Sequence, residues 1–200
     1  MDSTTAADHC AALVKEADHV RFVSALFAPG EVRRRLLALY AFDVELRRIR
    51  QAAREPLIVA MRFQWWRDAL TGLPEVTKGH PVLIELAAAG VGTDALLARV
   101  AARESGTEPA MAEGDLIALA ARCCGAPAGP NPIAAAAGVA IVTGEISFLN
   151  EARRLWRAER QARKAELPAY LPATYVDARH PVTALRLHWR ALTMALRNRF

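Results

Sequence analysis

The chain has 200 residues, of which 53% are hydrophobic, so it is long and apolar enough to fold and is not disordered by composition. Its formal net charge of +5 is compatible with an anionic partner, but an arginine-rich solvated surface explains it more simply. No run of residues has the apolar length of a membrane span, and no basic leader opens the sequence. We therefore expect a cytoplasmic location, at most peripheral to the inner membrane, with no signal peptide and no transmembrane segment.

Proline and glycine divide the sequence into blocks rich in alanine and leucine, residue types that favour helices. We expect helices over Thr5–Ala28, Glu31–Arg54, Pro56–Leu70, Pro81–Ala89, Thr93–Glu104, Gly114–Cys124, Ile133–Ala165 and Val182–Arg199. In the second block, apolar residues recur at three- and four-residue steps and form one stripe: Val32, Leu36, Leu39, Phe42, Leu46, Ile49 and Ala53. Because no hairpin signal, repeat or low-complexity linker is present, the sequence predicts one all-α, bundle-like domain over residues 1–200.

The same block carries a row of polar side chains. Asp43, Arg47 and Gln51 follow one another at four-residue steps, so they lie on one side of the expected helix. If exposed, an ion pair between Asp43 and Arg47 contributes only about 0.3–0.5 kcal/mol, and the row by itself is typical of a solvated helix face. The five histidines form no metal-binding motif, and no Walker, dinucleotide-binding or nucleophile-elbow motif is present.

Four segments of the first half stand in a recognisable order: Phe22–Pro29, Leu39-Tyr40-Ala41-Phe42, Gln64–Leu70 with two tryptophans, and Gly79-His80-Pro81-Val82. In this series the chain resembles the squalene/phytoene synthase family. The resemblance implies an isoprenoid-synthase-like helical bundle. It also implies that the C-terminal half is shortened, because a short linker with Pro168 and Pro172 leads from the long seventh block to the last helix.

Active members of that family hold Mg²⁺ with two acidic clusters and condense two prenyl diphosphates head to head. The resemblance places the first cluster on Arg47, Arg48 and Gln51, none of which is acidic here, and cationic side chains repel Mg²⁺. It places the second cluster near Phe148 and Glu151, with Glu145 off the register. No bound metal is therefore expected. The candidate cavity residues are Asp43, Arg47, Arg48, Gln51, Glu145 and Glu151.

The sequence resembles most the branch of the family that has lost the acidic clusters and includes a mitochondrial complex I assembly factor. This implies a non-catalytic binding or assembly protein, acting on a respiratory membrane complex through an unidentified protein partner, or on a prenyl lipid or diphosphate. One alternative is an active head-to-head prenyl diphosphate synthase, which would need Mg²⁺. A second alternative is a basic membrane-surface binding protein that uses Arg153–Lys164 and the last helix. No nucleic-acid motif is present, so no nucleic-acid partner is expected.

Overall fold

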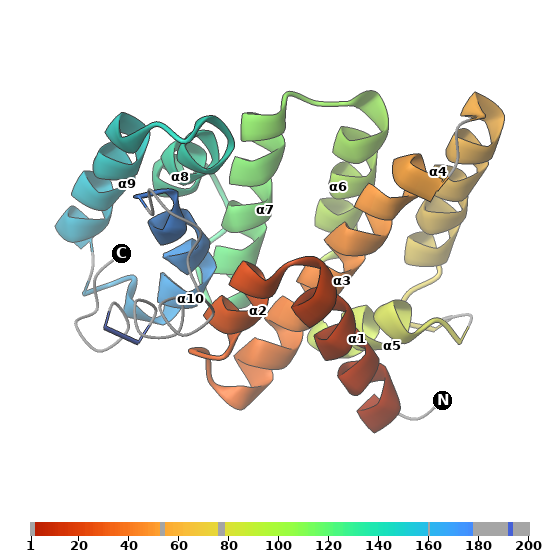
Figure 1. Ribbon diagram of the computed structural model, residues 1–200. Coiled ribbons are helices and arrows are strands. Elements are labelled where there is room, and N and C mark those ends of the chain that lie inside the picture. The colour runs from red at the N-terminus through yellow and green to blue at the C-terminus, as the bar shows by residue number, and fades with distance from the viewer. Residues whose placement is uncertain (1–2, 53–54, 76–78, 160, 178–191, 194–200) are drawn as a thin grey trace. The chain divides into compact units, whose positions relative to one another are not determined.

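The computed structural model describes residues 3–52, 55–75, 79–159, 161–177 and 192–193, and every regular element within these ranges is a helix (Figure 1). The all-α prediction is therefore confirmed. No described helix combines the length and apolar character that crossing a membrane requires. The chain divides into two compact units, Met1–His19 with Arg34–Thr107, and Val20–Arg33 with Glu108–Phe200. The prediction of one domain over residues 1–200 stays a prediction.

The first unit is built around the greater part of α3 (Gly30–Ala52). Its other helices are α1 (Ser3–Ala17), α4 (Pro56–Thr71), α5 (Pro81–Ala89) and α6 (Thr93–Ser105). Helix α1 packs against α5, and α4 packs against α6. The expected apolar stripe of α3 is buried from Leu36 to Ile49, but burial is wider than a stripe, because all nine residues from Leu36 to Val44 are buried. In this section α3 is a central helix rather than an amphipathic surface helix.

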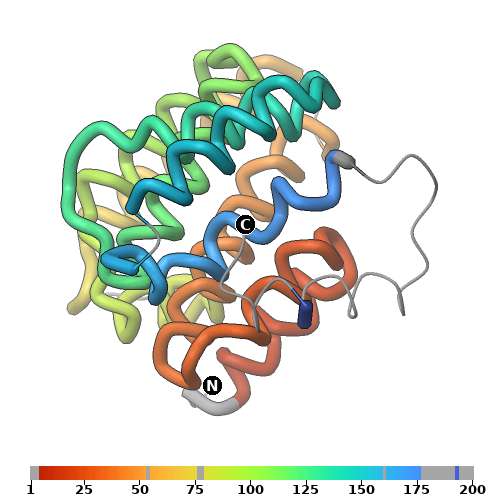
Figure 2. Tube along the Cα trace, turned by 90° about the vertical axis from the view of Figure 1, so that its left-hand side faces the viewer, coloured from red at the N-terminus to blue at the C-terminus, as the bar shows by residue number. Residues whose placement is uncertain are grey.

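The second unit contains most of α2 (His19–Ala25) together with α7 (Pro109–Cys123), α8 (Pro132–Thr143) and α9 (Ile146–Glu159). Three short elements follow, namely η1 (Lys164–Glu166), α10 (Leu167–Tyr170) and η2 (Leu171–Asp177). In Figure 2 the tube from α7 to η2 runs from green to blue. Helices α7 and α8 pack at very short range through two glycines. A methyl group added at Gly138 would lie only 2.6 Å from the Cα atom of Gly114, so Gly138 has no room for a side chain, whereas one added at Gly114 would lie 3.2 Å from the backbone of α8.

Two of the expected long helices are each divided in two. Thr5–Ala28 breaks at Asp18, whose carboxylate accepts a hydrogen bond from Arg47 Nη2 at 3.2 Å and whose residue type favours helix ends over helix interiors. Ile133–Ala165 breaks at Gly144, which takes a left-handed conformation with φ 73° and closes α8. The single-helix predictions were wrong at both places.

Two further expectations differ from the structure. Helix α7 begins at Pro109 rather than at Gly114, because the Glu108 side chain accepts a hydrogen bond from the Met111 amide at 2.9 Å and caps the helix start. The expected linker with Pro168 and Pro172 is instead helical, and α10 is buried throughout its four residues. The expected helix Val182–Arg199 lies outside the described residues, apart from residues 192–193.

Candidate functional site

Helix α3 presents two chemically different sides within the first unit. Asp43 and Arg47 are one helical turn apart and share one side. Glu45 lies about 200° around the helix from Asp43, at 100° per residue, and so belongs to the opposite side. Arg48, Ile49 and Ala52 follow Glu45 at the three-, four- and seven-residue spacings of one face. The two sides therefore need separate descriptions.

The Asp43 side is a buried ion-pair cluster. Asp43 is 1% exposed, and its Oδ1 accepts hydrogen bonds from Arg99 Nε at 2.9 Å and Arg99 Nη2 at 2.6 Å. Arg103 Nη2 donates to Asp43 Oδ2 at 2.9 Å, and Arg47 Nε lies 3.2 Å from the same oxygen. Three guanidinium groups thus surround one carboxylate. The prediction that this row is an ordinary solvated face was wrong for Asp43, because α6 supplies two arginines that cover it.

The structure brings only part of the expected site together. Asp43 and Arg47 are in contact, whereas Arg48 lies on the opposite side of α3 and Gln51 is exposed. Glu145 and Glu151 belong to the second unit. Glu145 is exposed, and Glu151 forms an ion pair with Arg154, with Oε1 and Nη2 2.6 Å apart. The part of the chain that the structure describes holds no group of three or more His, Cys, Asp or Glu side chains arranged to bind a metal ion.

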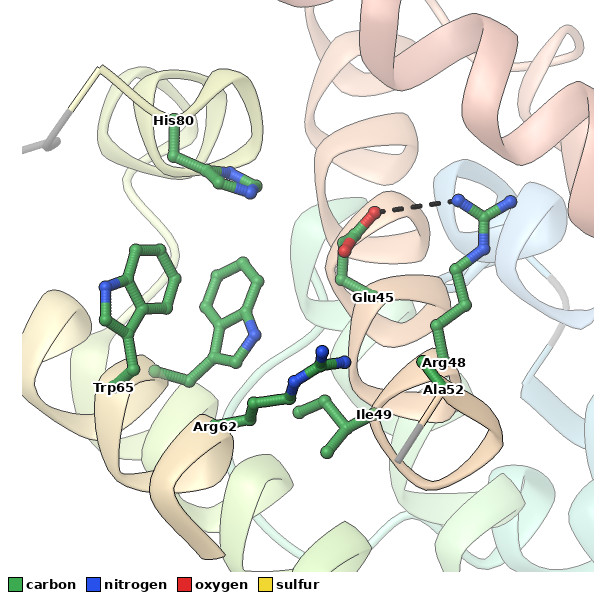
Figure 3. Close-up of a pocket in the computed structure, with 8 residues that line it drawn as sticks. Glu45, Arg48, Ile49, Ala52, Arg62, Trp65 and His80 are labelled. Atoms are coloured by element: carbon green, nitrogen blue, oxygen red, sulfur yellow. Dashed lines mark ion pairs between the residues drawn. The ribbon is translucent and has the colours of Figure 1, made fainter. Parts of the chain in front are cut away.

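The other side of α3 borders a hollow of about 360 Å³, which we call the α3–α4 hollow. Its lining residues are Glu45, Arg48, Ile49, Ala52, Arg62, Trp65, Trp66 and His80. Figure 3 shows Arg62 reaching from α4 toward α3, and His80 and Trp65 facing the space from the far wall. Arg62, Trp65 and Trp66 stand at i, i+3 and i+4 of α4, so the helical repeat alone places them on the same face of the helix.

The far wall of the α3–α4 hollow is aromatic. The ring centroids of Trp65 and Trp66 are 5.2 Å apart in an edge-to-face arrangement, and those of Trp66 and His80 are also 5.2 Å apart. Trp66 in turn packs edge-to-face on the fully buried Phe42 of α3. Trp65 remains 38% exposed. A rigid aromatic wall with one exposed ring is the type of surface on which a flat ligand can lie.

The charges of the α3–α4 hollow leave a positive balance. Glu45 and Arg48 form an ion pair, with Oε1 and Nη1 3.8 Å apart, shown as the dashed line in Figure 3. Arg62 has no acidic partner among the described residues. Burial lowers the pKa of His80 below its ordinary value of 6.5, with Glu45 acting to raise it and His9 to lower it, so the imidazole is neutral at pH 7. Two arginines and one glutamate therefore leave one net positive charge.

The sequence contained most of this hollow without indicating it. Trp65, Trp66 and His80 belong to the segments that carry the family resemblance, and nothing in those segments predicts a shared cavity. The sequence feature that could have indicated the hollow is helical spacing on two helices. One face of α3 carries Glu45, Arg48, Ile49 and Ala52, and one face of α4 carries Arg62, Trp65 and Trp66. What the sequence did not supply was that these two faces meet.

The second unit has a hollow of its own, of about 520 Å³. It is lined by Phe27, Pro29, Gln161, Ala162, Lys164, Ala165, Leu167 and Pro168. Lys164 is its one charged lining residue, so it offers less chemistry than the α3–α4 hollow despite its larger volume. We therefore take the α3–α4 hollow and the Asp43 cluster as the candidate site.

A central, buried α3 beside a tryptophan-bearing α4, within an all-α fold, is consistent with a helical protein of the isoprenoid-synthase-like class. Residues 14–109 match the family model described as squalene/phytoene synthase. This segment, which contains the Asp43 cluster and every residue lining the α3–α4 hollow, belongs to that family.

Several curated relatives carry one name, the assembly factor 6 of NADH dehydrogenase (ubiquinone) complex I. The Mus musculus protein is 34% identical over 79 residues, covering 39% of this chain and 24% of its own length. The Homo sapiens protein is 35% identical over 81 residues, covering 40% and 24%. The homolog from Drosophila melanogaster is 38% identical over 87 residues, covering 40% and 26%. The chain thus spans about a quarter of the length of these relatives, and no solved structure matches it significantly.

Replacing Asp43 by asparagine should strongly destabilise the first unit. The change removes the negative charge that is paired with the buried Arg99, and breaking a buried ion pair in this way costs about 3 kcal/mol or more. Urea unfolding followed by circular dichroism measures the loss. Glu151→Gln is the matched control, because it also removes one carboxylate from an arginine pair, but at the surface. Equal effects of the two changes would contradict the structural role assigned to Asp43.

Stability should also depend on the protonation of His80. Its pKa is lower in the folded state than in the unfolded chain, so the unfolded state binds the proton more readily. The contribution of His80 is fully present above pH 6.5 and is lost as the pH falls from there toward the folded-state pKa. The free energy of unfolding should therefore fall more steeply below pH 6.5 in the wild type than in His80→Gln. Parallel curves for the two proteins would show that the group is not buried as described.

Proposed function

We propose that the chain is a non-catalytic member of the squalene/phytoene synthase family that acts as a binding or assembly factor. The observation that carries the proposal is the buried cluster on α3, where Asp43 is held by Arg47, Arg99 and Arg103. Guanidinium groups occupy the side of the helix on which the resemblance places metal-binding carboxylates. A protein of this kind keeps the helical scaffold without the metal chemistry.

The geometry of the Asp43 cluster argues against Mg²⁺ at this place. Mg²⁺ requires oxygen ligands at short range in octahedral geometry. The Asp43 carboxylate already accepts hydrogen bonds on both oxygens, and the third guanidinium, that of Arg47, also binds Asp18. A metal ion would have to displace a buried arginine and leave its charge without a partner, which is strongly unfavourable.

The names of the relatives support an assembly role. Each is called an assembly factor of NADH dehydrogenase (ubiquinone) complex I. We propose by extension that the partner of this chain is a protein of a respiratory membrane complex, reached from the cytoplasmic side in peripheral contact with the inner membrane. A prenyl lipid or diphosphate is the second ligand class that the family relationship supports.

Calorimetric titration with a non-hydrolysable farnesyl diphosphate analogue, with and without Mg²⁺, tests the absence of metal chemistry. We expect no binding that depends on Mg²⁺, because the α3 positions repel the cation. Binding without Mg²⁺ would fit a diphosphate held by arginine side chains. A titration with Mg²⁺ alone is the control. Binding that requires Mg²⁺ would overturn the non-catalytic proposal and return Glu145 and Glu151 as candidate ligands.

Deletion of the gene in its own host tests the assembly role. We expect less assembled NADH–ubiquinone oxidoreductase, measured by native electrophoresis and by NADH oxidation in membranes. The wild-type gene should restore it, and so should the double variant Glu145→Gln with Glu151→Gln, because an assembly factor does not need these exposed carboxylates for metal binding. An unchanged level of the complex after deletion would contradict the assembly role. Rescue by the wild type but not by the double variant would favour an enzyme.

A further inference from the structure

The α3–α4 hollow lies on the side of α3 away from the Asp43 cluster. Of the three positions where the family resemblance puts the first metal-binding acids, Arg47 and Gln51 lie toward the Asp43 side, whereas Arg48 lines the hollow together with Glu45, Ile49 and Ala52. A ligand in the hollow would therefore make no use of the Asp43 cluster. The inference below is independent of the assembly role.

From its geometry and charge, we propose that the α3–α4 hollow binds a small planar organic carboxylate. The ring system of this ligand lies against Trp65 and the neighbouring aromatic wall, and its carboxylate pairs with Arg62. Arg48 provides the second positive charge at the α3 side.

Arg62 is the group that selects an anion. It lines the hollow from α4 and has no acidic partner among the described residues, while the charge of Glu45 is offset by Arg48 at 3.8 Å. A guanidinium group donates two parallel hydrogen bonds to a carboxylate, which fixes both its position and its plane. The neutral state of His80 adds no charge, so selection rests on the arginines.

The aromatic wall is the group that selects a flat ligand. Trp65 is 38% exposed, although its ring belongs to a packed series that continues through Trp66 to the buried Phe42. Because that series is anchored in the core, the exposed ring is held in place before a ligand arrives, and little side-chain entropy is lost on binding. Ile49 and Ala52 supply an apolar surface on the α3 side. The volume of about 360 Å³ falls in the range of small-ligand sites and suits a ligand of two fused rings.

The test uses the full chain with 2-naphthoate as the probe and 2-naphthamide as its neutral counterpart of the same shape. Isothermal titration calorimetry measures both affinities. We expect 2-naphthoate to bind about tenfold or more tightly than the amide, because the amide lacks the charge that pairs with Arg62. Arg62→Gln should remove this difference. Trp65→Leu should weaken both ligands, because it removes the surface that their rings share.

Arg35→Gln is the matched control, since Arg35 is an exposed arginine of α3 outside the hollow and the substitution is the same. It should leave both affinities unchanged. Thermal unfolding of each variant, without ligand, shows that the fold is retained. Equal binding of acid and amide would reduce the site to an apolar surface and overturn the proposal. Loss of 2-naphthoate binding in Arg35→Gln, or its persistence at full strength in Arg62→Gln, would place the ligand elsewhere and overturn it as well.

Discussion

The first unit depends on a buried carboxylate whose buried partner, Arg99, lies far along the chain. Asp43 lies in a central helix that is buried on all sides from Leu36 to Val44, so an unpaired charge there would oppose folding. Arg99 and Arg103, placed one turn apart on α6, supply the compensating groups. The pairing fixes the rotation of α3, because only one orientation of the helix brings Asp43 to α6. That rotation in turn sets which residues remain to line the hollow on the other side.

The same rotation gives the two sides of α3 different chemistry. On the Asp43 side lie Arg47 and Gln51, two of the three positions that the resemblance matches to metal-binding acids, and Arg47 is engaged in ion pairs. On the opposite side, an aromatic wall and an arginine without an acidic partner in the described chain face open volume. The two sides of α3 rely on different neighbours: α6 for the cluster, α4 and His80 for the hollow.

Local pattern was enough to predict the helical class, four of the eight expected helices to within two residues, and the apolar positions of α3 from Leu36 to Ile49. It failed where the decisive partner is remote in sequence. Asp43 was expected to be solvated because its partners lie 56 and 60 residues further along the chain. It failed again at Gly144, where alanine and valine on one side and a strongly amphipathic segment on the other suggest one continuous helix. The hollow could not be predicted, because helical spacing defines faces but not which faces meet.

The crossing of α7 and α8 has a consequence for how this sequence can change over time. Gly114 and Gly138 touch backbone to backbone, so one carbon atom added at Gly138 must push the helices apart, and one added at Gly114 would be tight against α8 at 3.2 Å. Few amino-acid substitutions are therefore tolerated at these two positions, whereas the exposed positions of α9 accept many residue types. The packing of the second unit thus depends on two residues without side chains, and a comparison of descendants should find these positions less variable than its large apolar side chains.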